Sequence, residues 1–314
     1  MDISRFDLNL LKTLDMLERE RSVQLSAARL NVTPSAVSHA LARLRRALGD
    51  PLFSRTGQEL VPTQRCREVL GQIRPFLSSV SLALDAERDR ITPFDPAMDR
   101  RSLTIVLPGA VELSLLPVLT AHLAQKAPGW ELTIRGFERR SYATDLLSGE
   151  ADIVLSVGGH TAHGTNLWIA PFWQDELVVL QGPNGPLPPD RPITLDEAVT
   201  LPQLYCVPWP REQNYLDIRL ARDGRRRPIA LSLPGYAAAG EALIGTGLIA
   251  ILPDRTALRL LARHGDLHLI RIAPSIHLPL SIETSQRFRS STAGAWILSE
   301  LLAMRPAVPC LPTD

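Results

Sequence analysis

Apolar residues recur at helical spacing through the first part of the chain. Leu8, Leu11, Leu14 and Leu17 predict a first helix over residues 6–20, and a second helix is expected over residues 24–30. After a two-residue turn, Thr33 can cap a third helix that Pro34 opens and that Gly49 stops after Leu48. Two short helices joined by a tight turn form the helix-turn-helix pattern.

The third helix has a small, polar and basic outer face. Its apolar stripe is Val37, Ala40, Leu41, Leu44 and Leu48, which leaves Ser35, Ser38, His39, Ala42, Arg43 and Arg46 outside. Such a face can be a solvated surface that happens to be rich in arginine, but the preceding helix pair favours insertion into the major groove of DNA. We therefore expect DNA contacts from this helix and its cap, through Thr33, Ser35, Ser38, His39, Arg43 and Arg46.

A hairpin and a long helix are expected next. Residues 52–55 and 60–61 predict two short strands of a wing, on which Arg55 can reach the phosphate backbone. From Thr63 a helix is expected to run to about Ile91, bent or weakened near residue 71 by Pro75. Apolar residues at steps of four and three form a dimerisation seam, which is Cys66, Leu70, Ile73, Leu77, Val80 and Leu84. The alternative is that this stripe packs against the body of its own chain.

The remaining residues alternate predicted strands and helices. Strands are expected at 103–107, 131–134, 153–157, 176–180, 204–207, 229–233, 248–252, 267–272 and 278–283, and the helix after the first of them at 113–125. This order predicts βαβ units, a largely parallel sheet and two α/β lobes. We expect three domains: a winged helix-turn-helix domain over 1–62, a linker helix over 63–91 and a two-lobed domain over 92–314. Lobe I is expected at about 100–158 and 270–314, and lobe II at about 159–269.

Charge supports this division of the chain. The formal net charge is only +1, but seven arginines against two acidic residues give residues 23–67 a balance of +5. A basic head on a near-neutral body is typical of a polyanion-binding module joined to another module. The three cysteines are widely spaced, and neither a signal-peptide core nor a long apolar run is visible, so a cytoplasmic protein without membrane contact is expected.

These residues resemble the LysR-type transcriptional regulators along nearly the whole chain. Residues 27–63 resemble the family's winged helix-turn-helix, and residues 147–152 and 245–253 are similar to two weaker motifs of its effector domain. The resemblance implies a periplasmic-binding-protein-like effector domain and a homodimer or homotetramer. Two positions depart from the family pattern: Pro34 replaces a common glutamine, and the turn 108–112 has Gly109 and Ala110 where relatives often place a hydroxyl.

An enzyme is the rival class for a two-lobed α/β body. The sequence has no GxSxG, no Walker loop and no GxGxxG after the first strand, so no catalytic residue is expected. His160 and His163 are read as loop residues and not as metal ligands, and the acidic pairs at 175–176 and 196–197 as turn and helix-start residues. No cofactor is expected.

Strand ends of the two lobes are the expected effector site, because open α/β sheets bind ligands there. The candidate residues are Gly109, Ala110, Val111, Pro208, Trp209 and Tyr236, although both aromatic side chains can equally pack under loops. We expect a regulator that binds double-stranded promoter DNA and whose binding is modulated by a small, largely apolar or aromatic effector. The alternative is a ligand-independent regulator with a vestigial effector domain.

Overall fold

The computed structural model describes residues 6–56, 59–91, 94–138, 141–157, 166–206 and 214–312. Within residues 78–91 it describes the side chains of Val80, Ala83 and Leu84. The chain divides into two compact units, residues 1–85 and residues 86–314, which we treat separately.

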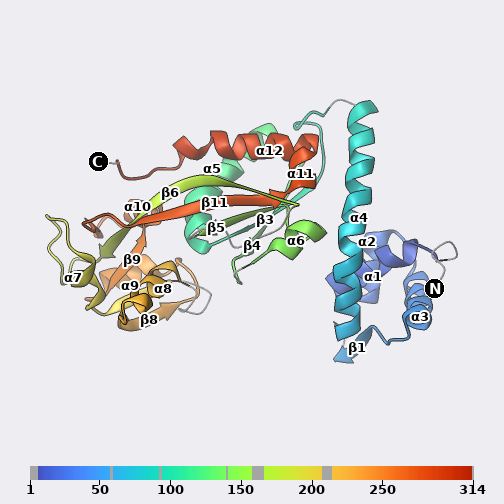
Figure 1. Cartoon of the computed structure of the whole chain (residues 1–314), viewed down its shortest axis with the longest axis horizontal. Helices are drawn as coiled ribbons and strands as arrows, with labels where there is room; N and C mark the ends of the chain where they lie inside the picture. Colours follow the sequence, from blue (N-terminus) through green and yellow to red (C-terminus); the bar gives the residue numbers. More distant parts are fainter. Residues whose placement is uncertain are drawn as a thin grey trace. The chain divides into compact units, whose positions relative to one another are not determined.

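The first unit is a winged helix-turn-helix (Figure 1). Its elements are α1 (Asn9–Glu20), α2 (Val23–Leu30), α3 (Pro34–Leu48), β1 (Phe53–Thr56), β2 (Glu59–Pro62) and α4 (Gln64–Ile91), which extends past the unit's boundary. Ser22 and Thr33 accept backbone N–H groups at the starts of α2 and α3, and Gly49 ends α3 with a φ of 66°. Local capping chemistry therefore sets the helix boundaries. The long helix α4 continues through Pro75.

The core of this unit includes the start of α4. Leu14 and Leu17 of α1 and Leu44 of α3 are fully buried, and Cys66 and Leu70 from α4 join the same cluster. Burial raises the pKa of the Cys66 thiol to about 11. The first turns of α4 thus belong to the head itself.

The second unit is an α/β domain built on one continuous sheet. Its elements are β3 (Ser102–Leu107), α5 (Gly109–Lys126), β4 (Glu131–Gly136), α6 (Ala143–Ser148), β5 (Ile153–Val157), β6 (Leu167–Gln181), α7 (Leu195–Val199), β7 (Gln203–Cys206), α8 (Tyr215–Arg222), β8 (Ile229–Leu233), α9 (Ala239–Ile244), β9 (Ile249–Pro253), α10 (Asp254–Arg263), β10 (His268–Arg271), β11 (His277–Ser285), α11 (Gln286–Ser290), α12 (Thr292–Ala303) and a 3-10 turn (Arg305–Ala307). Among the described residues, the strand order is β4-β3-β5-β11-β6-β9-β7-β8, with β10 paired to β6.

The sheet is mixed, which corrects the expectation of a largely parallel one. Strand β3 is parallel to β4 and β5, and β7 is parallel to β8 and β9. Between these two sets, β11 and β6 run antiparallel to their neighbours. We call the part built on β3, β4 and β5 lobe I and the part built on β7, β8 and β9 lobe II. The strands β6 and β11 pass through both.

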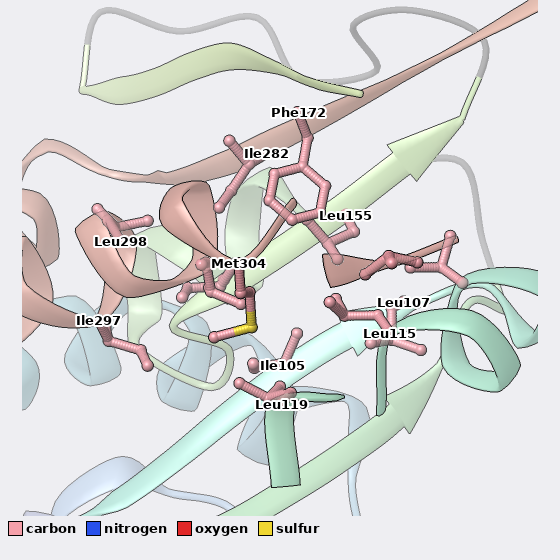
Figure 2. Packing of buried hydrophobic residues seen from close by; sticks show 14 of the residues in the cluster. Ile105, Leu107, Leu115, Leu119, Leu155, Phe172, Ile282, Ile297, Leu298 and Met304 are labelled. Atoms are coloured by element: carbon pink, nitrogen blue, oxygen red, sulfur yellow. The ribbon is translucent and has the colours of Figure 1, made fainter. Parts of the chain in front are cut away.

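Each lobe has its own apolar core. In lobe I, α5 and α12 pack on one face of the sheet around Ile105, Leu115, Phe172 and Ile297 (Figure 2). In lobe II, Val179 and Leu180 are adjacent on β6 and point to opposite faces, so each belongs to a different cluster. The clusters on the two faces of the sheet are separate in each lobe, and β6 and β11 pass from one lobe to the other.

Some sequence boundaries were wrong for physical reasons. The predicted strand 176–180 is the end of the 15-residue strand β6, which the sequence obscures because Pro171, Gln174 and Asp175 interrupt its apolar pattern. The pair Asp175-Glu176 is therefore strand and not turn, whereas Asp196-Glu197 does open α7 beneath a Thr194 capping box. Helix α5 starts at Gly109 and not at Leu113; no side chain caps it, so the sequence carries no start signal, and the Val111 and Glu112 N–H groups donate to the Pro108 carbonyl.

The C-terminal segment links the two lobes. Met304 and Val308 lie in the lobe I core, whereas Leu311 packs against a lobe II core. The Leu311 N–H donates to Asp254 Oδ2 at 2.8 Å, and Arg271 Nη2 donates to the Pro312 carbonyl at 2.8 Å. No helix among the described residues is long and apolar enough to cross a membrane.

Candidate DNA-binding and effector sites

The outer face of α3 carries the predicted DNA-contacting side chains. Thr33, Ser35, Ser38, His39, Arg43 and Arg46 are all exposed in the described structure, as is Arg55 on β1. The Thr33 hydroxyl oxygen accepts the Ala36 N–H at 3.2 Å, so its own proton remains available to a DNA oxygen. The helix therefore presents short hydroxyl side chains and one imidazole near its N-terminus, with arginines further along.

Arg43 has a partner that the sequence did not reveal. Its Nη1 lies 2.9 Å from Asp7 Oδ2, and both side chains are accessible, at 50% and 33% exposure. Asp7 Oδ1 also accepts the Asn9 N–H at 3.1 Å at the start of α1. Together the Asn9 N–H and the Arg43 guanidinium lower the pKa of Asp7. The ion pair ties the start of α1 to the outer face of α3.

The wing is fixed to α3 by polar contacts. Strands β1 and β2 are antiparallel, with Arg55 opposite Leu60. Arg45 Nε donates to the Pro51 carbonyl at 2.8 Å, and Asp50 Oδ1 accepts the Leu52 N–H at 2.6 Å. Arg45 and Asp50 thus position the wing, a role that the sequence alone did not reveal because both contacts depend on the turn geometry after α3.

The predicted seam on α4 has two different environments. Leu70 is 1% exposed in the head core, and Ile73 packs against that core. Leu77 is half-buried, whereas Val80 and Leu84 are 40% and 67% exposed, and Phe76 beside them is 48% exposed. In the single chain, only the second half of the seam is open to a partner.

Two of the candidate effector segments meet in the structure. A Cβ built at Gly109 would lie 3.6 Å from two ring carbons of Tyr236, so the first turn of α5 packs directly on an aromatic ring from lobe II. Burial raises the pKa of the Tyr236 hydroxyl above its ordinary value. Pro208 and Trp209 lie outside the described residues. The segments that follow the carboxyl ends of β3 and β8 are therefore in contact.

The rest of the α5 turn is anchored on both sides. The Ala110 carbonyl accepts Thr256 Oγ1 at 3.1 Å, which ties it to α10 of lobe II. Val111 is 3% exposed, and its side chain lies in the lobe I core. Within this turn, Gly109 and Ala110 are half-buried, whereas the Val111 side chain is buried.

A buried ionic cluster lies where β6 crosses between the lobes. Asp175 Oδ1 is 2.5 Å from Arg255 Nη1, and Asp175 Oδ2 accepts Trp173 Nε1 at 3.1 Å. The Arg255 guanidinium also stacks on the Trp173 ring, 4.8 Å from its centroid. Sequence analysis missed this cluster because it assigned Asp175 to a turn. The cluster joins the crossing strand β6 to the start of α10.

A second buried polar pair lies inside the lobe I sheet. Ser156 and Glu283 are fully buried on the neighbouring strands β5 and β11, and the Ser156 hydroxyl donates to Glu283 Oε1. Because the carboxyl ends of the parallel strands β3 and β5 meet at one edge, this pair lies near the edge from which α5 departs. The described residues contain no cluster of side chains suited to a metal ion, and His160 and His163 lie outside them.

Comparison with known proteins matches both units. Residues 8–67 match the family model "Bacterial regulatory helix-turn-helix protein, lysR family", and residues 97–304 match the "LysR substrate binding domain". The chain is 30% identical over 257 residues to the transcriptional activator NahR of Pseudomonas putida, covering 82% of this chain and 83% of NahR. It is 29% identical over 259 residues to Nodulation protein D 1 of Sinorhizobium fredii, covering 82% of this chain and 78% of that protein.

Solved structures show the same fold. The probable transcriptional regulator PA0477 from Pseudomonas aeruginosa superposes with a TM-score of 0.69 at 30% identity, covering 95% of this chain and 97% of that one. The full-length CbnR in complex with its target DNA superposes with a TM-score of 0.63 at 17% identity, covering 95% and 99%.

Proposed function

This chain belongs to the LysR family of bacterial transcriptional regulators, and we propose which of its residues bind DNA, effector and a second copy of the chain. It is a DNA-binding regulator with an effector-binding domain. The family is one of regulators and not of enzymes, and we infer that this chain has no catalytic activity and works in the cytoplasm. We propose the domain division 1–62, 63–91 and 92–314.

DNA recognition is assigned to α3 and the wing. Ser35, Ser38 and His39 occupy the exposed N-terminal part of α3, where a recognition helix reaches base edges. Arg43, Arg46 and Arg55 are exposed on the same head, and long guanidinium side chains suit phosphate oxygens. Pro34 offers no hydrogen-bonding side chain, so base readout depends on the two serines and the imidazole.

The effector site is assigned to the junction of α5 with lobe II. The observation that supports it is the approach of the first turn of α5 to the Tyr236 ring: a Cβ at Gly109 would lie 3.6 Å from two ring carbons, so a ligand enters here only when the ring and the turn separate. We infer a small aromatic or largely apolar effector whose binding separates the ring from the turn. A ligand that binds the opened state better shifts the lobes towards it.

A substitution at Gly109 tests this site. Gly109→Trp should force a large side chain against the Tyr236 ring and abolish the ligand-dependent change in the DNA footprint, while leaving DNA binding intact. The effector is first found by screening small aromatic compounds for stabilisation of the full-length protein against heat. The matched control is Gly265→Trp, since a Cβ at Gly265 meets nothing within 4 Å.

The outcome separates two functions. Loss of response in the Gly109 variant alone supports the proposed effector site. A normal response in that variant places the effector elsewhere, and a wild-type footprint that no ligand changes supports the ligand-independent regulator.

Dimerisation is assigned to the second half of the α4 seam. Leu77, Val80 and Leu84 follow one stripe, and Val80 and Leu84 are large exposed apolar side chains of a single chain. We propose that they pair with a second copy to form a dimer, from which a tetramer can assemble, and that Leu70 and Ile73 support the seam from within the head.

A further inference from the structure

The ion pair between Asp7 and Arg43 changes the charge that the head presents to DNA. Of the three arginines assigned to phosphates, Arg43 alone pairs with a carboxylate among the described residues. Asp7 is held in place, because its other oxygen accepts the Asn9 N–H at the start of α1. The described structure thus places a carboxylate beside Arg43 on the recognition surface.

A phosphate bound by Arg43 would meet that carboxylate. Charge-assisted hydrogen bonds of guanidinium are about 2.7 to 2.9 Å long, so a phosphate oxygen and Asp7 Oδ2 would both lie next to the same group, within roughly 4 to 6 Å of each other. Two anions at that distance repel, and the pair of Asp7 and Arg43 carries no net charge. Arg43 then releases fewer counterions from DNA than an unpaired arginine would.

We propose that Asp7 limits the sequence-independent affinity of this protein for DNA by neutralising Arg43 on the recognition surface. The inference rests on the proposed phosphate contact of Arg43. Arg46 and Arg55 supply the phosphate attraction that remains, and base contacts by Ser35, Ser38 and His39 then contribute a larger share of binding. Asp7 acts as a positioning residue, since its effect passes through Arg43.

The substitution Asp7→Asn tests the proposal. Asparagine keeps an oxygen that can accept the Asn9 N–H, so α1 should still form, but it removes the negative charge. Freeing Arg43 for one phosphate contact should steepen the slope of log K against log salt by about 0.9. At 0.1 M salt, this steeper slope corresponds to about eightfold tighter binding than that of the wild type. The probe is a random-sequence DNA duplex titrated with the full-length protein at several salt concentrations, and no operator is needed.

Two controls isolate the effect. Glu20→Gln also adds one positive charge to the head, at an acidic residue paired with Arg29. Thirteen residues separate positions 7 and 20, roughly 20 Å along a helix, which exceeds the Debye length of about 10 Å at 0.1 M salt. This variant should leave the slope unchanged. In the double variant Asp7→Asn with Arg43→Ala, the gain should disappear.

The results distinguish the inference from the phosphate contact on which it rests. Tighter binding by Asp7→Asn that Arg43→Ala cancels supports both. If Arg43→Ala weakens binding while Asp7→Asn leaves it unchanged or weakens it, Arg43 contacts DNA but Asp7 does not limit the affinity. If neither substitution changes the slope, the phosphate contact itself is wrong.

Discussion

Leu84→Asp should dissociate the dimer without unfolding either unit. Leu84 lies on the predicted seam of α4, and its side chain is 67% exposed in the single chain, so the head does not depend on it. In a paired seam the same side chain would be covered by the partner helix. Aspartate at this position would place a charge in that contact.

The size of the effect follows from the exposed area. Complete burial of a leucine side chain contributes about 1.5 to 3 kcal/mol, so covering the exposed two-thirds contributes about 1 to 2 kcal/mol per chain. Two chains lose this contribution, giving about 2 to 4 kcal/mol, which is roughly a 30- to 700-fold weaker dimer. Burial of the new carboxylates adds to this loss.

Sedimentation velocity across micromolar concentrations measures the change. The matched control is Gln72→Asp, which adds the same charge at an exposed position of α4 outside the seam. Leu70→Asp should behave differently, because Leu70 is buried in the head and its substitution should lower the head's melting temperature. A Leu84→Asp protein as dimeric as the Gln72→Asp control would refute the assignment of the seam.

Three further outcomes follow from the described contacts. Arg55→Ala should weaken binding to specific and random DNA alike, because Arg55 is assigned to one phosphate. Salt titration should show the slope of log K against log salt becoming shallower by about 0.9, and an unchanged slope would mean that the wing does not contact DNA. Asp217→Ala removes the carboxylate that accepts two hydrogen bonds, at 2.7 and 2.9 Å, from the buried Arg227 guanidinium. Urea unfolding should show the free energy of unfolding of lobe II falling by about 3 to 5 kcal/mol. A loss below about 1 kcal/mol would mean that the pair is hydrated. Burial raises the pKa of Asp152 to about 6, so the folded protein holds the proton of this carboxyl more tightly than the unfolded chain does. The stabilisation that this proton gives is complete below about pH 4 and is lost as the pH rises through 6. Urea unfolding should show the wild type losing up to about 3 kcal/mol relative to Asp152→Asn over this interval, and parallel pH profiles would contradict it.

The helices of the head could be predicted because their determinants are local. The stripe of α3, its Thr33 cap and its Gly49 stop all lie within one helix length, and each is visible in the sequence. The Asp7 and Arg43 pair could not be predicted, because it joins residues 36 positions apart whose approach depends on how α1 crosses α3. Likewise, the division of the α4 seam depends on how far the head core extends along that helix.

The second unit shows where periodicity fails. Strand β6 pairs with β11 over residues far apart in the chain, and its polar members are stabilised by tertiary contacts such as the Asp175 and Arg255 pair. Burial of a polar residue through a distant partner has no local signal. The strand-end rule places Gly109 and Tyr236 on facing sides of one effector site, which stays a prediction, and their direct contact was not predicted.

The position of β11 also has a consequence for synthesis of the protein. Of the described strands, translation delivers β11 last, yet it lies between β5 and β6 within the sheet. On the ribosome, the strands of lobe II can pair as soon as residue 271 has emerged, whereas β5 keeps an unpaired edge until residues 277–285 follow. An open apolar strand edge recruits other chains. Nascent chains that stop short of β11 should therefore be prone to aggregate through the open edge of β5.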